Sequence, residues 1–375
     1  MDPRTAEIRK TAGELFAEDK IDLFIGFEAG TLPLRSRPCF LSAREAGEDG
    51  AMERLVWDSF CANNLAAYLQ KYHENEPNRR KPREKAYPRI GIAAKACDLR
   101  SIVALTKERQ VRRESLVVVG VPCRGMIDRR KVEAAAAAGG SAHPGPGGAP
   151  IEILAHRESK DGMLEVTLRG GQTMSWPREE VLQDCCLECR LPAPEGADIV
   201  VSGEARKPGD GGYGRIQEFE AKSLEERWEY FRGELARCIR CNACRQACPT
   251  CWCKECFAEQ TDLKWIGVGT DPSDTMFFQI IRIFHQAGRC VECDACYRAC
   301  PMGIDLRLYT KKIVKDVEEA FGYLPGFDPE EAPPLTTFSE KDTDDFITDP
   351  DKPAGAGAPS GGHETQAKGH GKSNG

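Results

Sequence analysis

One cysteine spacing occurs twice in this chain, and it restricts the fold more than any other feature. Each copy places three cysteines three residues apart, then a fourth cysteine four residues later, directly before a proline. The copies are Cys238-x2-Cys241-x2-Cys244-x3-Cys248-Pro249 and Cys290-x2-Cys293-x2-Cys296-x3-Cys300-Pro301. Three cysteines at this spacing can wrap a short turn around three corners of an iron–sulfur cube, while the fourth lies beyond the turn and binds a neighbouring cluster.

The spacing therefore predicts a ferredoxin-like domain with two 4Fe–4S clusters that exchange their fourth ligands. The first cluster is expected on Cys238, Cys241, Cys244 and Cys300, and the second on Cys290, Cys293, Cys296 and Cys248. Structural zinc sites are the alternative, but they usually pair two CxxC units some distance apart. Two complete sets, each with a proline after the fourth cysteine, fit zinc poorly.

The segment between the two copies predicts a helix over residues 274–287, with Ser273 or Asp274 as its N-cap and Gly288 beyond its end. A helix here favours the mainly helical type of two-cluster domain. We interpret the apolar side chains of this helix as core packing: Met276, Phe277, Ile280, Ile281 and Phe284.

The composition restricts where this chain works and what it binds. Its 375 residues carry a net charge of −7, which argues against nucleic acid as the main partner. Neither a membrane span nor an export signal is predicted from the apolar pattern. Eighteen cysteines without an export signal indicate metal or redox chemistry in the cytoplasm of an organism that keeps oxygen away from exposed clusters.

The N-terminal part predicts an α/β domain with a mixed or mainly parallel sheet. We expect a helix at 5–18, a short strand at 21–27, and two buried strands at 89–95 and 116–121 joined by a crossover helix at 98–109. Each of these two buried strands ends at a cysteine, Cys97 and Cys123. Ligand sites of open α/β sheets gather at the carboxyl ends of the strands, so both cysteines are well placed for a cofactor.

Several cysteines lie outside the repeat. Cys185, Cys186 and Cys189, together with Cys97 or Cys123, would supply four thiolates for a third cluster. A second group, Cys251, Cys253 and Cys256, is either part of a further site or a set of packed or solvent-facing thiols. Cys39 and Cys61 stand alone and are expected to be buried free thiols.

Three regions follow from these patterns. An α/β redox domain is predicted over residues 1–222, with a Gly/Pro-rich surface insertion at 134–150 and a hairpin across 151–176. Residues 223–325, which begin with a helix near 224–235, form the dicluster domain. Residues 326–375 are acidic and Gly-rich and lack the apolar content that would offset the entropy of ordering, so a disordered tail is predicted.

Short motifs in the first region resemble the beta-subunit family of deazaflavin-reducing (coenzyme F420) hydrogenases and formate dehydrogenases. These are KACD at 95–98, GVPCRG at 120–125, Cys186-x2-Cys189 and the strand that begins at 197. The resemblance implies iron–sulfur clusters, a flavin (FAD), and a third cluster on Cys123, Cys186 and Cys189 with Cys97 or Cys185 as the fourth ligand. The chain departs from the best-known members because its dicluster domain lies on the C-terminal side.

The resemblance implies an electron-transfer subunit of an anaerobic oxidoreductase complex of the formate dehydrogenase, hydrogenase or heterodisulfide-reductase type. Other subunits of such a complex would be its partners. The alternative is a flavin-dependent reductase that acts directly on a deazaflavin or another small two-electron acceptor.

Two further features allow more than one interpretation. No GxGxxG or Walker motif is present, so the loop Gly209–Gly214 either approaches a flavin phosphate or is a surface turn. Four arginines lie near the repeat: Arg240, Arg245, Arg289 and Arg298. They either raise the reduction potential of the clusters, by favouring the more negative reduced state, or serve only solubility.

Overall fold

The structure is a computed structural model that describes residues 2–73, 87–139, 152–159 and 161–338. Met1–Leu335 form one compact unit. The disorder predicted from residue 326 is wrong for the start of the tail, where Phe327 stacks under Arg100 and the Asp328 carbonyl accepts a hydrogen bond from Lys107. The rest of the predicted tail lies outside the described residues from 339 onward, and so does the predicted insertion from 140 onward. No helix within the described ranges is long and apolar enough to span a membrane.

The main sheet is five-stranded and mixed, which confirms the predicted α/β class. In spatial order its strands are β2 (Ser36–Ser42), β1 (Leu23–Ala29), β3 (Ile90–Ala94), β4 (Leu116–Gly120) and β8 (Ile199–Val200). β2 runs antiparallel to β1, while β1, β3, β4 and β8 are parallel. Every residue of β3 is buried, as expected for a strand covered on both faces.

The strand expected at 197–202 is only the two-residue β8 at the sheet edge. A side chain replaces part of its ladder, because the Asp198 carboxylate accepts the backbone N–H of Val118 at 2.7 Å. The preceding turn also lies very close to β4, since a Cβ added to Gly120 would come within 2.6 Å of Ala197. Side-chain packing therefore closes this edge of the sheet after a short stretch of pairing.

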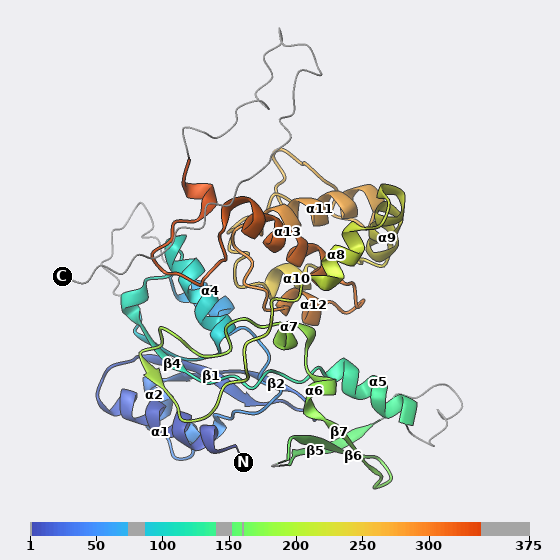
Figure 1. Ribbon diagram of the computed structural model, residues 1–375. Helices are drawn as coiled ribbons and strands as arrows, with labels where there is room; N and C mark the ends of the chain where they lie inside the picture. Colours follow the sequence, from blue (N-terminus) through green and yellow to red (C-terminus); the bar gives the residue numbers. More distant parts are fainter. Residues whose placement is uncertain (1, 74–86, 140–151, 160, 339–375) are drawn as a thin grey trace, which may run out of the picture. The chain divides into compact units, whose positions relative to one another are not determined.

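The helices are α1 (Pro3–Ala17), α2 (Ala43–Ala46), α3 (Gln70–His73), α4 (Ala96–Lys107), α5 (Arg129–Gly139), α6 (Arg178–Val181), α7 (Asp184–Leu187), α8 (Gly214–Glu220), α9 (Leu224–Ala236), α10 (Ala243–Gln246), α11 (Pro272–Phe284), α12 (Ala295–Ala299) and α13 (Leu306–Phe321). Short 3-10 turns occur at Ala51–Arg54, Leu65–Tyr68 and Arg113–Ser115. Figure 1 shows α1 and α4 on opposite sides of the main sheet. The core between them includes Ile8, Phe24, Ile92, Leu99 and Val118.

The expected hairpin is a separate three-stranded antiparallel sheet. Its strands are β5 (Ile153–Glu158), β6 (Met163–Leu168) and β7 (Thr173–Pro177). The alternating burial of β6 places Leu164 and Val166 against Val132 and Ala136 of α5. The alanine run at the start of the predicted insertion therefore continues α5, because one of its alanines packs into this small core.

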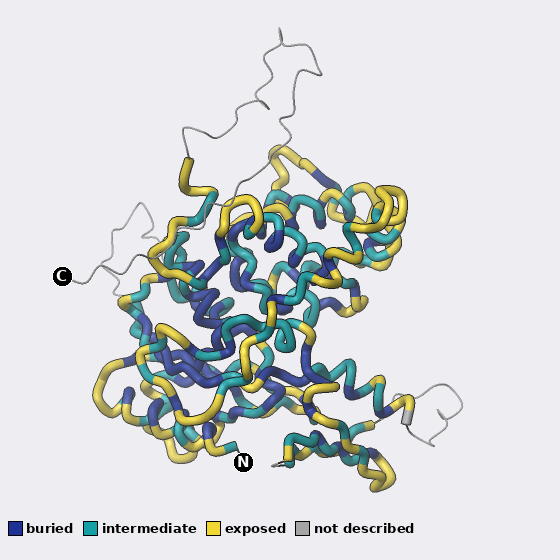
Figure 2. The backbone as a smooth tube through the Cα atoms, viewed as in Figure 1, coloured by how far each residue is buried: buried dark blue, intermediate teal, exposed yellow. Residues whose placement is uncertain are grey.

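The cysteine-rich region is mainly helical, with α8 to α13 in the upper half of Figure 1. The predicted helix at 224–235 is α9 and the one at 274–287 is α11. Asp271, rather than Ser273 or Asp274, caps α11, because its carboxylate accepts the N–H groups of both later residues. Figure 2 shows buried backbone in the sheet and again where this region meets it.

The packing predicted for α11 holds only in part, because Met276, Ile280 and Ile281 are partly buried and Met276 packs against a core cluster, whereas Phe277 and Phe284 do not. Its buried residues are Thr275, Phe278, Gln279, Arg282 and Ile283. Phe277 and Phe284, expected in the core, are 45% and 60% exposed. The inward face of this helix meets the two cysteine copies, whose sulfur and backbone groups need polar partners, so polarity decides which face turns inward.

Two glycine substitutions test the packing of the sheet. A Cβ at Gly91 of β3 would lie 2.6 Å from Phe24 and 2.9 Å from Ile21, so Gly91→Ala should destabilise the fold by about 1–3 kcal/mol. A Cβ at Gly13 of α1 meets nothing within 4 Å, so Gly13→Ala should stabilise it by about 0.5–1 kcal/mol. Anaerobic thermal unfolding followed by circular dichroism measures both. Equal midpoints for the two variants would contradict this packing.

Candidate metal centres

Two hollows in the helical region are each lined by four cysteines, and each set draws on both copies of the repeat. The first hollow is lined by Cys238, Cys241, Cys244 and Cys300, with Phe278, Gln279 and Leu306 around them. The second is lined by Cys290, Cys293, Cys296 and Cys248, with Thr250, Arg282, Gln286 and Thr310 around them. The fourth cysteine of each copy thus lies with the first three of the other copy.

The backbone of the two copies follows the same path. Arg240 and Asn242 in the first copy have φ of 53° and 58°, and the equivalent Glu292 and Asp294 in the second have 58° and 54°. Left-handed backbone at non-glycine residues costs about 1–2 kcal/mol each, so its repetition at matching positions indicates a required geometry. Alternating left- and right-handed residues make successive N–H groups converge into an anion-binding nest, a feature of many Fe–S sites.

Two sulfur atoms of the second set also accept backbone hydrogen bonds. Backbone N–H groups stabilise the thiolates of Cys290 and Cys293, but burial outweighs them and raises the pKa of Cys293 to about 11. Burial raises the pKa of Cys296 to about 12. These thiols would stay protonated at neutral pH without a cation, and a bound metal deprotonates a coordinating thiol. The donor set, the nests and the burial fit a 4Fe–4S cluster.

Access differs between the two hollows. Cys241 of the first set is exposed, whereas Cys244 and Cys300 are buried. Every cysteine that lines the second hollow has intermediate exposure. The first hollow therefore has a solvent-facing ligand position.

Across the described part of the chain, no three His, Cys, Asp or Glu side chains gather tightly enough for a single metal ion.

A third hollow lies beyond the carboxyl ends of β3 and β4, where the α/β topology predicts a site. Its lining contains all five extra cysteines proposed for a third cluster: Cys97, Cys123, Cys185, Cys186 and Cys189. Cys293 of the second set lines it as well, together with Val291 and Glu292. The second and third hollows thus share a wall made by the loop of the second cysteine copy.

The thiols of the third hollow differ in their electrostatics. The sulfur atoms of Cys185 and Cys186 lie 4.0 Å apart, and the N–H of Met126 lies 3.3 Å from the Cys186 sulfur; these contacts lower the pKa of Cys186 to about 7. Burial raises the pKa of Cys123 to about 12, although the N–H of Gly125 reaches its sulfur at 3.4 Å. Burial also keeps the pKa of Cys97 well above its usual value. The neighbours of Cys123 include Cys186 and Cys189.

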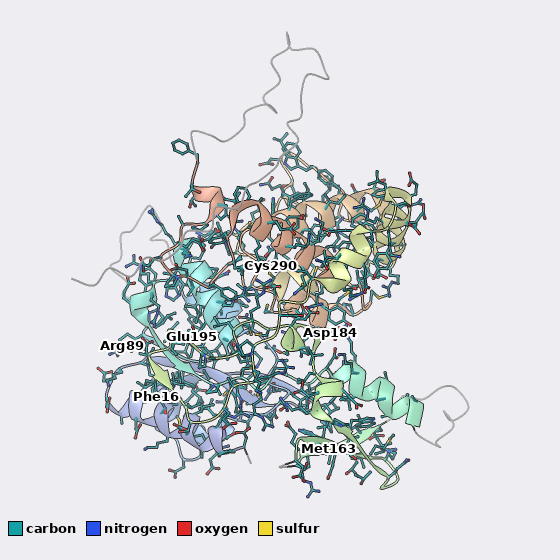
Figure 3. The ribbon with its side chains drawn as sticks, viewed as in Figure 1. Phe16, Arg89, Met163, Asp184, Glu195 and Cys290 are labelled. Atoms are coloured by element: carbon teal, nitrogen blue, oxygen red, sulfur yellow. The ribbon has the colours of Figure 1, made fainter. Side chains whose placement is uncertain are left out.

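Buried ion pairs connect the α/β domain to the helical region beside the third hollow. Arg307 of α13 pairs with Asp294 at 2.9 Å and with Glu188, and Lys311 pairs with Glu188 and Glu292 at 2.9 Å each. Burial raises the pKa of Asp294 to about 6 even beside Arg307. Asp184, labelled in Figure 3, begins α7 between the sheet and the region that holds Cys290. The network joins α13, the second cysteine copy and the residue that follows α7.

The loop Gly209–Gly214 packs against the Cys189 turn. The N–H of Gly209 donates to the carbonyl of Cys189 at 2.7 Å, and the N–H of Gly211 donates to Glu188 at 3.2 Å. A Cβ at Gly209 would lie 2.4 Å from the carbonyl oxygen of Leu187. Glycine is needed here for close approach to a cysteine-bearing turn of the chain.

The arginines predicted to influence the clusters lie in different environments. Arg298 is half-buried and donates to Gln183 and Cys293 at 2.7 Å and to Ala62 at 2.8 Å. By contrast, Arg245 pairs with Glu259 and Arg289 with Glu108, while Arg240 stacks on Phe278. Sequence reasoning missed Arg282, which lines the second hollow. The available signal was a single charge inside the apolar run FFQIIRIF.

The remaining cysteines divide into two kinds. Cys39 and Cys61 are fully buried in the core, as expected. Cys251 and Cys253 line a hollow that borders the second set through Cys248, while Cys256 is buried beside Arg245. Both interpretations of this trio remain open on this geometry.

Comparison with known proteins identifies relatives of this chain. Residues 87–213 match the family model for the C terminus of the beta subunit of coenzyme F420 hydrogenase/dehydrogenase. An F420-dependent formate dehydrogenase subunit beta of Methanocaldococcus jannaschii is 24% identical over 66% of this chain and 76% of its own length. An F420-dependent formate dehydrogenase 1 subunit beta of Methanococcus maripaludis is 28% identical over 48% of this chain and 45% of its own.

Among solved structures, a chain of the F420-reducing NiFe hydrogenase complex from Methanosarcina barkeri is 14% identical. The match covers 60% of this chain and 80% of that chain, with a TM-score of 0.36.

The buried ion pairs predict a specific loss on mutation. Glu188→Gln keeps the shape of the side chain but removes the charge that faces Arg307 and Lys311, so it should destabilise the chain by about 1.5 kcal/mol. Glu225→Gln, on the exposed first turn of α9, should change stability by less than about 0.5 kcal/mol. Anaerobic denaturant titration compares the two. An equal change in the free energy of unfolding for the two variants would mean that the ion pairs contribute nothing to docking the helical region on the α/β domain.

Proposed function

We propose that this chain is an iron–sulfur electron-transfer subunit of an anaerobic oxidoreductase complex, because residues 87–213 match the family model for the beta subunit of coenzyme F420 hydrogenase/dehydrogenase. The complex would be of the formate dehydrogenase, hydrogenase or heterodisulfide-reductase type. The observation that carries this proposal is the presence of three cysteine-lined hollows in one compact unit.

The proposed ligand sets follow the hollows. In this proposal Cys238, Cys241, Cys244 and Cys300 hold the first 4Fe–4S cluster, and Cys290, Cys293, Cys296 and Cys248 hold the second. Cys123, Cys186 and Cys189 hold a third, with Cys97 or Cys185 as the fourth ligand. When bound, such clusters accept and release single electrons at potentials set by hydrogen bonds, charge and exposure.

The chain's own residues support transfer between these sites. Loop residues 291–293 line both the second and the third hollow, so this loop forms the wall between the two hollows. Exposed Cys241 gives the first hollow a surface edge where a partner protein can dock. The buried ion pairs of α13 hold the helical region against the α/β domain and keep the separation constant. In this proposal the α/β domain and the dicluster domain meet near residue 222. Electrons pass between the surface edge at Cys241 and the third hollow.

A second candidate function is a flavin-dependent reductase that acts directly on a deazaflavin. It is favoured by the two relatives described as F420-dependent formate dehydrogenase beta subunits. Basic side chains line the third hollow, including Lys95, Arg100 and Lys311, and they suit an anionic cofactor. FAD is the flavin that we propose for this activity.

Metal and flavin analysis tests the cluster assignment. Anaerobically purified protein should carry about twelve irons and as many sulfides per chain, four for each cluster. Cys123→Ala should lose about four of these irons because it removes one ligand of the proposed third cluster. Cys39→Ala, a control in the core of the sheet, should keep all of them. Zinc in place of iron would rule out the proposal, and about eight irons in the parent chain would remove the third cluster from it.

Flavin content separates the two candidate functions. A reductase should retain about one flavin per chain and transfer electrons from reduced viologen to a deazaflavin. An electron-transfer subunit without its own substrate should carry clusters and no flavin, and it should be oxidised only when a partner oxidoreductase is added. Flavin-free protein that still reduces the deazaflavin would contradict both.

A further inference from the structure

One face of α11 and its C-terminal extension is polar although it is buried. Thr275, Gln279, Arg282 and Gln286 are spaced four, three and four residues apart, so they lie on one side of the helix. Their exposure is 2%, 2%, 3% and 2%. Burying polar groups in this way is costly unless hydrogen-bond partners are present. The cost implies that this row of side chains, which we call the α11 stripe, serves the sites it faces.

The α11 stripe contacts both sets of cysteines. Gln279 lies with its side-chain nitrogen 3.7 Å from the sulfur of Cys238, in the first set. Gln286 accepts a hydrogen bond from Thr250 at 2.6 Å, and its oxygen lies 3.5 Å from the sulfur of Cys248, in the second set. Both glutamines therefore sit within reach of ligand sulfur, on opposite sides of Arg282.

Arg282 lies at the centre of the stripe and is only partly satisfied. Its Nη2 donates to the carbonyl of Cys244 at 2.9 Å. Its Nε and Nη1 are buried and find no acceptor among the residues that the structure describes. An unsatisfied buried donor costs about 1–3 kcal/mol, and more when it is charged. Two such donors on one guanidinium therefore favour an acceptor other than the residues that the structure describes.

The surroundings of Arg282 identify that acceptor as sulfur. Arg282 lines the second hollow together with its four cysteines. Burial alone would lower its pKa, but the sulfur atoms of Cys244, Cys296 and Cys248 raise it when they are deprotonated. A bound metal deprotonates the coordinating thiols, so the sulfur atoms of a bound cluster would supply the negative charge that this guanidinium faces.

We propose that Arg282 is a positioning residue that donates its free N–H groups to sulfur atoms of the second 4Fe–4S cluster and thereby raises the reduction potential of that cluster. The proposal rests on the proposed function, because it requires the clusters. Reduction adds one electron and one negative charge to a cluster, with no bond made or broken. A fixed positive charge and N–H···S hydrogen bonds favour that more negative state.

The test compares the parent chain with Arg282→Lys, Arg282→Gln and the control Arg232→Gln, whose side chain is 54% exposed on α9. Each protein is purified anaerobically, its iron is counted, and its clusters are titrated with dithionite under electron paramagnetic resonance. Arg282→Gln should keep its iron and make one cluster harder to reduce, by at least about tenfold in the equilibrium constant. Arg282→Lys should lie between it and the parent, and Arg232→Gln should match the parent.

Unchanged potentials in an Arg282→Gln protein with full iron would overturn the proposal. If this variant loses a cluster, the parent chain grown with 15N-arginine gives a second measurement. Pulsed electron paramagnetic resonance of the reduced protein should show hyperfine coupling to an arginine nitrogen. The absence of this coupling would likewise overturn the proposal. A parent chain without iron would instead refute the proposed function, so the two failures are distinguishable.

Discussion

Buried ion pairs between α13 and two loops are the interaction on which the rest of this structure depends. Arg307 and Lys311 neutralise carboxylates from the second cysteine copy and from the turn after α7. Isolated buried charges would be strongly unfavourable, but a network in which each charge has an opposite partner can be tolerated. Its position beside the third hollow means that the same contacts that hold the helical region also determine how the cysteine sets face one another.

The α11 helix illustrates how a site can reverse ordinary packing. Its aromatic residues Phe277 and Phe284 face outward, and a row of polar side chains faces inward. Hydrophobic burial would favour the opposite orientation. The inward orientation follows because the inner face meets cysteine sulfur and a backbone carbonyl, which accept hydrogen bonds from Gln279 and Arg282. The exposed aromatic residues are the consequence of that orientation.

The family match and the cysteine repeat lie in different parts of the chain. The match covers residues 87–213, which include β3, β4 and the five cysteines of the third hollow. The cysteine repeat lies entirely beyond this match. The two parts meet at the loop that carries Cys293, because it lines both the second and the third hollow. The part that matches the beta-subunit family model is thus joined to the helical, cysteine-rich part through a shared wall.

The sequence by itself determined the cysteine repeat, the α/β class and the elements with strong periodicity, such as α1, β3, β4 and α4. It also indicated that Cys97 and Cys123 would meet, because parallel strands end at one edge of a sheet. Only the tertiary structure decided which face of α11 turns inward, that Arg282 is buried between the cysteine sets, and that Glu188 joins α13. These outcomes depend on what each side chain meets across the fold, and local spacing carries no information about such distant partners.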